Sequence, residues 1–253
     1  MAIPDYMRIS DGFRHVAAAL ALIVVPAAIP AAHSADRPGA GAIHVLLSGD
    51  YHGDEVAHGS GPGWLALVLK SGTARLEPVT LKVSRVFDAL LDEEGKPPYT
   101  GKRVASLPAV EALALLRGAG LKPGPLDGAT LTGPREGLAG KSFSLGARRY
   151  TLDVASGCGR RAGTCGWTLS DGAIRQTVAE LEVTRTADGS LDTDSANTGL
   201  IWAGDLDGDG RLDLILDVSN HYNAVAQVRV FLSSRAAPGR LVGEAASFGA
   251  VGC

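Results

Sequence analysis

The chain has 253 residues, of which 33 are glycine and 13 are proline, and its 24 Lys and Arg against 27 Asp and Glu give a formal net charge of −3. This weakly acidic balance offers no basic surface to the phosphates of nucleic acid or to an anionic membrane, so we expect neither as a partner. The hydrophobic content of 45% is ordinary for a globular protein and argues against general disorder, while the glycines and prolines predict many turns.

The first 34 residues have the pattern of a secretory signal peptide. Arg8 and Arg14 precede an apolar run at residues 16–29, and small residues follow it up to Ser34. The run is shorter than the ~20 residues that an apolar helix needs to span a bilayer. We therefore predict cleavage after Ser34, with cleavage after Ala35 as the alternative, and a secreted or periplasmic mature protein without a membrane span.

All three cysteines, Cys158, Cys165 and Cys253, belong to the mature part of the chain, in a compartment that we expect to be oxidising. Cys158 and Cys165 flank a glycine-containing segment that can close into a small covalent ring, so we predict a disulfide between them. Pairing of Cys253 with either of these, or with another chain, remains open. No Cys-x-x-Cys redox motif is present.

Short strands are the first elements that we predict in the mature chain. Residues 42–47 and 64–69 are apolar and are separated by a polar, glycine-rich loop. Residues 75–86 alternate in places between apolar and polar side chains, which is typical of a half-buried strand. Acidic residues, a glycine and two prolines at 92–98 then predict a solvated turn.

Residues 107–118 form the one helix that we predict in the mature chain. Val110, Leu113 and Ala114 recur near helical spacing, and Pro108 suits a first turn. The glycines that follow would end this short helix.

Glycine and proline recur throughout residues 122–140, which we interpret as a linker or extended loop. It would separate an N-terminal β-rich region, residues 35–121, from a C-terminal β-rich region, residues 141–253. In the C-terminal region we predict strands at residues 142–145, 150–154, 166–169, 173–184 and 227–232. Strands joined by turns indicate an antiparallel β architecture.

Residues 205–213 carry the strongest chemical signal in the chain. They read Asp-Leu-Asp-Gly-Asp-Gly-Arg-Leu-Asp, with carboxylates at the first, third, fifth and ninth positions and Gly210 at the sixth. The carboxylates are those of Asp205, Asp207, Asp209 and Asp213. This spacing is typical of calcium loops, because alternate positions on a tightly wound loop direct oxygen ligands toward one centre and the glycine permits the turn. Without a cation these charges would repel one another.

The residues after this motif distinguish it from an ordinary EF-hand. Position twelve is Leu216 and not a bidentate glutamate, and residues 214–218 read as an apolar strand rather than a helix. We expect the main-chain carbonyl of Arg211 to point inward with its side chain in solvent, and Asp213 to close the site directly or through water. The sequence therefore predicts an EF-hand-like loop within a β-hairpin.

Residues 203–215 resemble the calcium loop of FG-GAP and VCBS-type repeats, which form strand–loop–strand units around a structural calcium. The resemblance implies these ligands: Asp205, Asp207, Asp209, Asp213 and the carbonyl of Arg211. It covers about residues 202–234 in a single copy, whereas the family repeats the unit around a β-propeller. We therefore expect a mainly β fold of antiparallel sheets with one short helix and no full propeller. The mature chain also resembles secreted bacterial proteins that end in such a loop, which implies no activity.

Two further groups of polar residues are candidate sites. The cluster at residues 219–223 contains His221, which could serve as a general base, but a turn whose side chains bond the backbone is the favoured interpretation. A second group could hold a transition metal, but it lacks the spacing of a His-Glu-x-x-His helix and its neighbouring glycines indicate a loop. Its members are His52, Asp54, Glu55 and His58.

Two other patterns are interpreted as structural. The glycine-rich residues 59–63 lack a following helix and a P-loop lysine, which excludes a nucleotide cradle. Trp64, Trp167 and Trp202 could stack on sugars, but tryptophans beside strand residues usually belong to the core, and we predict that position for all three.

Together these features favour an exported, non-catalytic calcium-binding protein in which Ca²⁺ stabilises a β-hairpin used for structure or for interaction with a protein or glycan. One alternative is an exported hydrolase that uses His221 or residues 52–58 and holds calcium only as a structural ion. The other is a calcium-dependent carbohydrate binder that uses the exposed metal and a tryptophan face.

Overall fold

The computed structural model describes residues 41–132, 140–154, 163–185, 191–192, 199–219 and 224–251. All of them belong to the unit Pro38–Cys253. The predicted signal peptide at residues 1–34, together with Cys158, His221 and Cys253, lies outside the described residues. Within the described ranges, no helix is long and apolar enough to cross a membrane.

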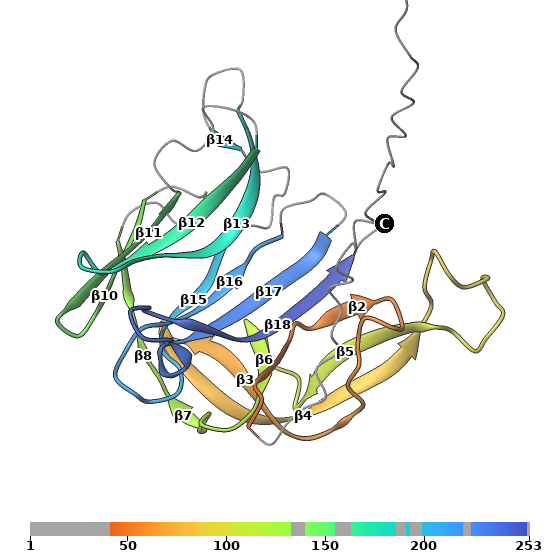
Figure 1. The fold of residues 1–253 in the computed structure, drawn as a ribbon. Coiled ribbons are helices and arrows are strands. Elements are labelled where there is room, and N and C mark those ends of the chain that lie inside the picture. Colours follow the sequence, from red (N-terminus) through yellow and green to blue (C-terminus); the bar gives the residue numbers. More distant parts are fainter. Residues whose placement is uncertain are drawn as a thin grey trace, which may run out of the picture. The chain divides into compact units, whose positions relative to one another are not determined.

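The described residues form three antiparallel sheets and one 3-10 turn, η1 (Ser233–Arg235), as Figure 1 shows. The predicted mainly β, antiparallel architecture is therefore confirmed. These ranges contain neither an α-helix nor a propeller.

The first sheet comes from the N-terminal half of the mature chain. Its strands, in spatial order, are β1 (His44–Leu46), β6 (Ala114–Arg117), β3 (Gly61–Lys70), β4 (Thr73–Val86), β5 (Gly101–Leu107) and β2 (Gly49–Tyr51), with β7 (Gly124–Pro125) paired to β4. β6 thus lies between the two strands predicted first, and the long loop between β4 and β5 extends beyond the sheet (Figure 1).

The predicted helix at residues 107–118 is wrong. Leu107 ends β5, and Ala114–Arg117 is β6, which pairs with both β1 and β3. The side chains of Leu115 and Leu116 point to opposite faces of the sheet and both have 0% exposure. A strand buried on both faces is apolar at every position, and such a short run cannot be distinguished from a buried helix by its periodicity.

The second sheet contains the strands predicted between residues 142 and 184. Its order is β14 (Leu191–Asp192), β13 (Arg175–Arg185), β12 (Gly163–Ser170), β11 (Arg148–Val154), β10 (Lys141–Leu145) and β9 (Thr130–Thr132). Cys165 on β12 is disulfide-bonded, while both candidate partners lie outside the described residues.

The third sheet carries the predicted calcium hairpin. Its order is β18 (Gly243–Val251), β17 (Ala224–Leu232), β16 (Asp213–Asp217), β15 (Gly199–Asp205) and β8 (Asp127–Gly128). Residues 122–140, predicted as a linker or loop, thus supply three short strands, β7, β8 and β9, one to each sheet.

The third sheet contributes side chains to a core on each of its faces, which places it between the other two sheets. Ile215 packs into a core shared with the first sheet, while Leu214 and Leu216 pack into a core shared with the second. All three are 0% exposed, which explains the apolar run at the centre of β16. The loop that connects β15 to β16 is therefore anchored in the central layer of the protein.

The three tryptophans belong to these cores, as predicted. Trp64, Trp167 and Trp202 are 1%, 0% and 6% exposed. A calcium-dependent carbohydrate binder would therefore lack the tryptophan face that this alternative requires.

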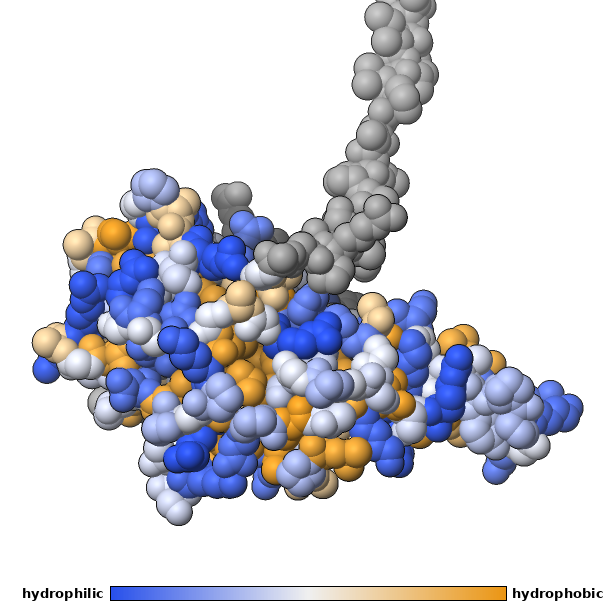
Figure 2. All heavy atoms as spheres, turned by 90° about the horizontal axis from the view of Figure 1, so that it is seen from below, coloured by the Kyte–Doolittle hydropathy of each residue, from blue (hydrophilic) through white to orange (hydrophobic). Residues whose placement is uncertain are grey.

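Large apolar side chains also remain at the surface. Those with the greatest exposure are Leu69, Phe87, Leu90, Leu91, Leu107 and Val251. Figure 2 shows hydrophobic residues interspersed with hydrophilic ones over the face seen from below.

Candidate metal centre

The acidic loop connects two paired strands, as the hairpin prediction requires. β15 ends at Asp205 and β16 begins at Asp213, and the register pairs Gly204 with Asp213. Leu206 and Leu212, at the two ends of the loop, are 1% and 2% exposed and enter different cores. These two apolar anchors hold the polar residues between them at the surface.

The structure gathers three of the four predicted carboxylates. Oxygen atoms of Asp205, Asp207 and Asp209 all lie within 4.8 Å of one another. Asp205 is buried, Asp207 is half-buried and Asp209 is exposed. No other group of three His, Cys, Asp or Glu side chains in the described part of the chain approaches this closely. Three carboxylates at this separation can hold a metal ion.

Asp205 organises the loop by accepting backbone hydrogen bonds. Its Oδ1 accepts from the N–H groups of Gly208 and Asp209 at 2.8 and 3.0 Å, and its Oδ2 accepts from the N–H of Gly210 at 2.8 Å. The φ angles of Gly208 and Gly210 are 81° and 76°, in the left-handed region that glycine adopts without steric cost. The loop is therefore wound around the first carboxylate.

Asp207 contributes a carboxylate oxygen that accepts no hydrogen bond. Its Oδ2 accepts from the hydroxyl of Ser234, whereas its Oδ1 is buried and has no hydrogen-bond partner among the described residues. Buried polar atoms are rarely left without a partner, because they lose their contacts with water. A cation held between the three carboxylates would satisfy this atom, so the residues present fit a metal ion.

Asp209 is paired within the loop. Its Oδ1 accepts from the N–H of Arg211 at 2.9 Å, and its Oδ2 accepts from the Arg211 guanidinium at 2.7 Å and the hydroxyl of Ser233 at 2.7 Å. Burial favours the neutral carboxyl, but these bonds from Ser233 and Arg211 outweigh it and lower the pKa of Asp209. The Arg211 side chain, expected in solvent, therefore covers part of the acidic charge while remaining 46% exposed.

Asp213 takes a different position from the other three carboxylates. It is 0% exposed, and its two oxygens accept from the N–H groups of Leu206 and Ser233, each at 2.7 Å. Burial raises the pKa of Asp213 to about 7. In this structure Asp213 ties the start of the loop to η1, and it is not one of the three clustered carboxylates. Its ligand role, like that of the Arg211 carbonyl, stays a prediction.

Sequence reasoning missed the two serines of η1. Ser233 and Ser234 approach the loop from the connection between β17 and β18 and donate hydroxyl hydrogen bonds to Asp209 and Asp207. They follow the motif by some twenty residues, and a pair of serines after a strand is no signal of metal binding.

The polar side chains at residues 52–58 do not gather around one point. His52 Nδ1 lies 2.6 Å from Asp88 Oδ2, and Glu55 accepts from the N–H of His52 at 2.9 Å. Asp54 is exposed, and His58 stacks against other rings. These side chains form no transition-metal centre in the described residues. In the cluster at 219–223, Ser219 donates to Asp217 at 2.5 Å and the remaining residues lie outside the description.

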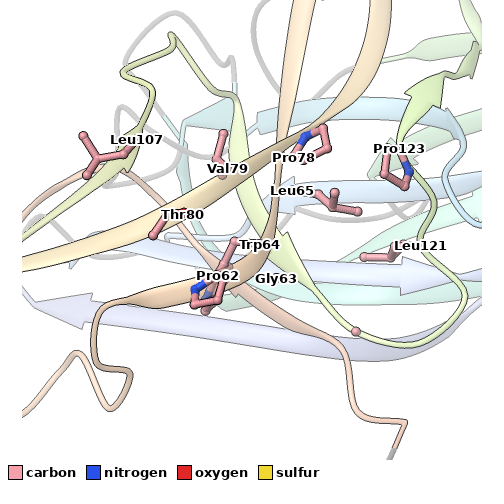
Figure 3. A pocket seen from close by; sticks show the side chains of 11 residues that line it. Pro62, Gly63, Trp64, Leu65, Pro78, Val79, Thr80, Leu107, Leu121 and Pro123 are labelled. Carbon is pink, nitrogen blue, oxygen red and sulfur yellow. The ribbon is translucent and has the colours of Figure 1, made fainter.

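An open pocket of about 460 Å³ lies on the first sheet (Figure 3). Its lining is mainly apolar and includes Pro62, Trp64, Pro78, Leu107 and Leu121. No titratable acid or base side chain lines it, so the pocket supplies no group for general acid–base chemistry.

The chain was also compared with known proteins. No protein-family model, curated protein or solved structure matches it. The clustered carboxylates of the loop at residues 205–213 therefore carry the functional interpretation.

Proposed function

We propose that this is an exported, non-catalytic protein in which residues 205–213 bind one calcium ion that stabilises the β15–β16 hairpin for a structural or interaction role. The observation that carries the proposal is the cluster of Asp205, Asp207 and Asp209, whose carboxylates lie within 4.8 Å of one another. The buried, unpartnered Oδ1 of Asp207 supports the presence of a cation at this position.

The ligand chemistry favours calcium over other metals. The cluster contains carboxylates and neither thiol nor imidazole, which disfavours zinc and copper. Calcium accepts six to eight oxygen ligands in flexible geometry, whereas magnesium demands near-ideal octahedral coordination. A glycine-containing loop with carboxylates at alternate positions, as in the FG-GAP and VCBS-type loops that it resembles, suits the less demanding ion.

The position of the loop supports a stabilising role. Its two strands belong to the central sheet, where Leu214 and Ile215 pack into the two different cores. A cation that relieves the repulsion between the loop carboxylates therefore stabilises the connection between strands on which both cores depend.

Export is supported by two features. The first 34 residues have the pattern of a signal peptide, and the disulfide bond of Cys165 suits an oxidising compartment. The N-terminal sequence of protein recovered from outside the cytoplasm tests this part of the proposal. We expect it to begin at Ala35, or at Asp36 if cleavage follows Ala35, and an intact N-terminus at Met1 would contradict it.

Thermal unfolding with chelator and with calcium tests the metal site. At a calcium concentration one hundred times Kd, binding stabilises the folded state by about 2.7 kcal/mol. For a protein of this size that corresponds to a rise in Tm of roughly 5–10 °C. Asp207→Ala and Asp209→Ala should each abolish the rise, because each removes a charged ligand. Asp54→Ala, which removes an exposed carboxylate elsewhere, should retain it. A full rise in both loop variants would overturn the assignment.

A further inference from the structure

A second cluster of polar side chains lies on the first sheet, far in sequence from the acidic loop. His44 on β1, Arg117 on β6 and Trp64 on β3 come from three adjacent strands, and the register pairs His44 directly with Arg117. His58, from the loop between β2 and β3, completes the group.

Contacts connect the four side chains in one cluster. The His44 and His58 rings meet edge to face with centroids 4.8 Å apart, and His58 meets Trp64 in the same way at 5.2 Å. The guanidinium carbon of Arg117 lies 4.9 Å from the centroid of the Trp64 ring. Arg117 Nη2 also lies 3.5 Å from His58 Nδ1. If Arg117 donates in this contact, the proton of neutral His58 is on Nε2, which is then a hydrogen-bond donor.

The cluster is cationic and has no counterion within the described ranges. No hydrogen bond or ion pair found there joins Arg117 to a carboxylate, although its side chain is half-buried. Burial, and then the charge of Arg117, lowers the pKa of His44. Burial, and then His44 and Arg117, lowers the pKa of His58. No acidic group contributes to either shift, so among the residues that the structure describes no carboxylate compensates the charge of Arg117.

We propose that Arg117, His44 and His58 form a binding site for an oxyanion, such as a sulfate or carboxylate group of a ligand. A partly desolvated guanidinium without an anion is unfavourable, and Arg is the side chain best suited to hold two oxygens of one oxyanion. Trp64, 1% exposed beneath the guanidinium, fixes the position of that group. The two imidazoles add donors from a neighbouring strand and a loop.

The same residues are poorly suited to a metal cation. Two imidazoles can ligate a transition metal, but the adjacent Arg117 charge opposes it. Within the described residues, no carboxylate or thiol lies close enough to complete a third ligand. The proposal is independent of calcium binding, because the site shares no residue with the loop at 205–213.

Titration of the histidine rings by NMR tests the site in the mature protein. The probe is sodium sulfate, whose charge is constant between pH 5.5 and 8, against sodium chloride at equal ionic strength. A bound oxyanion favours the imidazolium, so sulfate should raise the pKa of His44 and His58 by about one unit. His52, which is paired with Asp88, is the internal control and should titrate alike in both salts. Identical curves for His44 and His58 in chloride and in both oxyanion probes, sulfate and acetate, would overturn the proposal.

Sodium acetate as a second probe distinguishes a planar from a tetrahedral oxyanion, and a rise with either supports the site. Arg117→Gln should remove the sulfate-dependent rise. Arg75→Gln, which removes the same charge from a side chain 42% exposed on the same sheet, should leave it unchanged. A full sulfate effect in Arg117→Gln would show that the anion does not bind at this cluster.

Discussion

Asp213→Ala should destabilise the protein even when no calcium is present. The carboxylate is fully buried and accepts two backbone hydrogen bonds of 2.7 Å, from Leu206 and Ser233. Removing it leaves both N–H groups buried without an acceptor, and each costs about 1–3 kcal/mol. The expected loss is therefore roughly 2–6 kcal/mol, a large part of the ~5–15 kcal/mol that stabilises a typical protein.

Urea unfolding in chelator measures this loss of stability, and two further variants serve as comparisons. Asp213→Asn keeps one carbonyl acceptor for the two donors and should lose about half as much. Asp207→Ala should change stability little in chelator, because Oδ1 has no donor and the Ser234 hydroxyl that bonds Oδ2 is exposed and can bond to water instead. The variant should nevertheless lose the stabilisation by calcium. If Asp213→Ala matches the wild type in chelator, Asp213 does not tie the loop to η1.

The pH dependence of the same measurement has a defined sign. Burial raises the pKa of Asp213 to about 7 from an ordinary value of 3.8, so the folded state binds more protons than the unfolded state between these values. In chelator, the contribution of Asp213 to stability is thus present at low pH and is lost as pH rises toward 7. Asp213→Asn cannot titrate and should lack this component, so an equal pH slope in the two proteins would contradict the burial argument.

Three further predictions concern other positions. Gly210→Ala places an alanine at a φ of 76°, which costs about 1–2 kcal/mol, and should weaken calcium binding about tenfold in a titration. The hydrogen bond to Asp88 raises the pKa of His52. The contribution of His52 to stability is therefore present below its ordinary pKa of 6.5 and is lost as pH rises above the raised value. Urea midpoints should fall more between pH 6 and 8 in the wild type than in His52→Ala. Gln176, 5% exposed, donates to the carbonyl of Val242 at 2.8 Å and accepts from its N–H, and Gln176→Ala should lose about 2–4 kcal/mol in thermal unfolding.

The elements that could be predicted from sequence are those with a strong local signal. The strand at residues 75–86 was predicted from its partial alternation, and it is observed as β4, in which buried side chains alternate with more exposed ones along much of its length. The hairpin around residues 205–213 was predictable because the aspartates, the glycine and the following apolar run each have a local structural meaning.

The elements that could not be predicted depend on contacts between distant parts of the chain. Residues 114–116 of β6 are apolar because they are buried on both faces of the sheet, which the helix prediction did not anticipate. The short strands β7 and β8 contain glycine and proline and exist because longer strands, β4 and β15, pair with them. Their own sequences favour turns.

The same distinction applies to the side chains at the two sites. The clustering of Asp205, Asp207 and Asp209 follows from spacing within one loop. Ser233 joins that loop only because the third sheet brings η1 beside it. The pairing of His44 with Arg117 requires the register of β1 and β6, which no local pattern specifies.

Calorimetric titration of the chelator-treated mature protein with calcium, with magnesium as the control, tests the metal site most directly. We expect saturable calcium binding near one equivalent and much weaker binding of magnesium. Extracellular calcium modules still respond at about 10⁻³ M. Absence of calcium binding up to that concentration would reduce residues 205–213 to an acidic turn and contradict the proposed function.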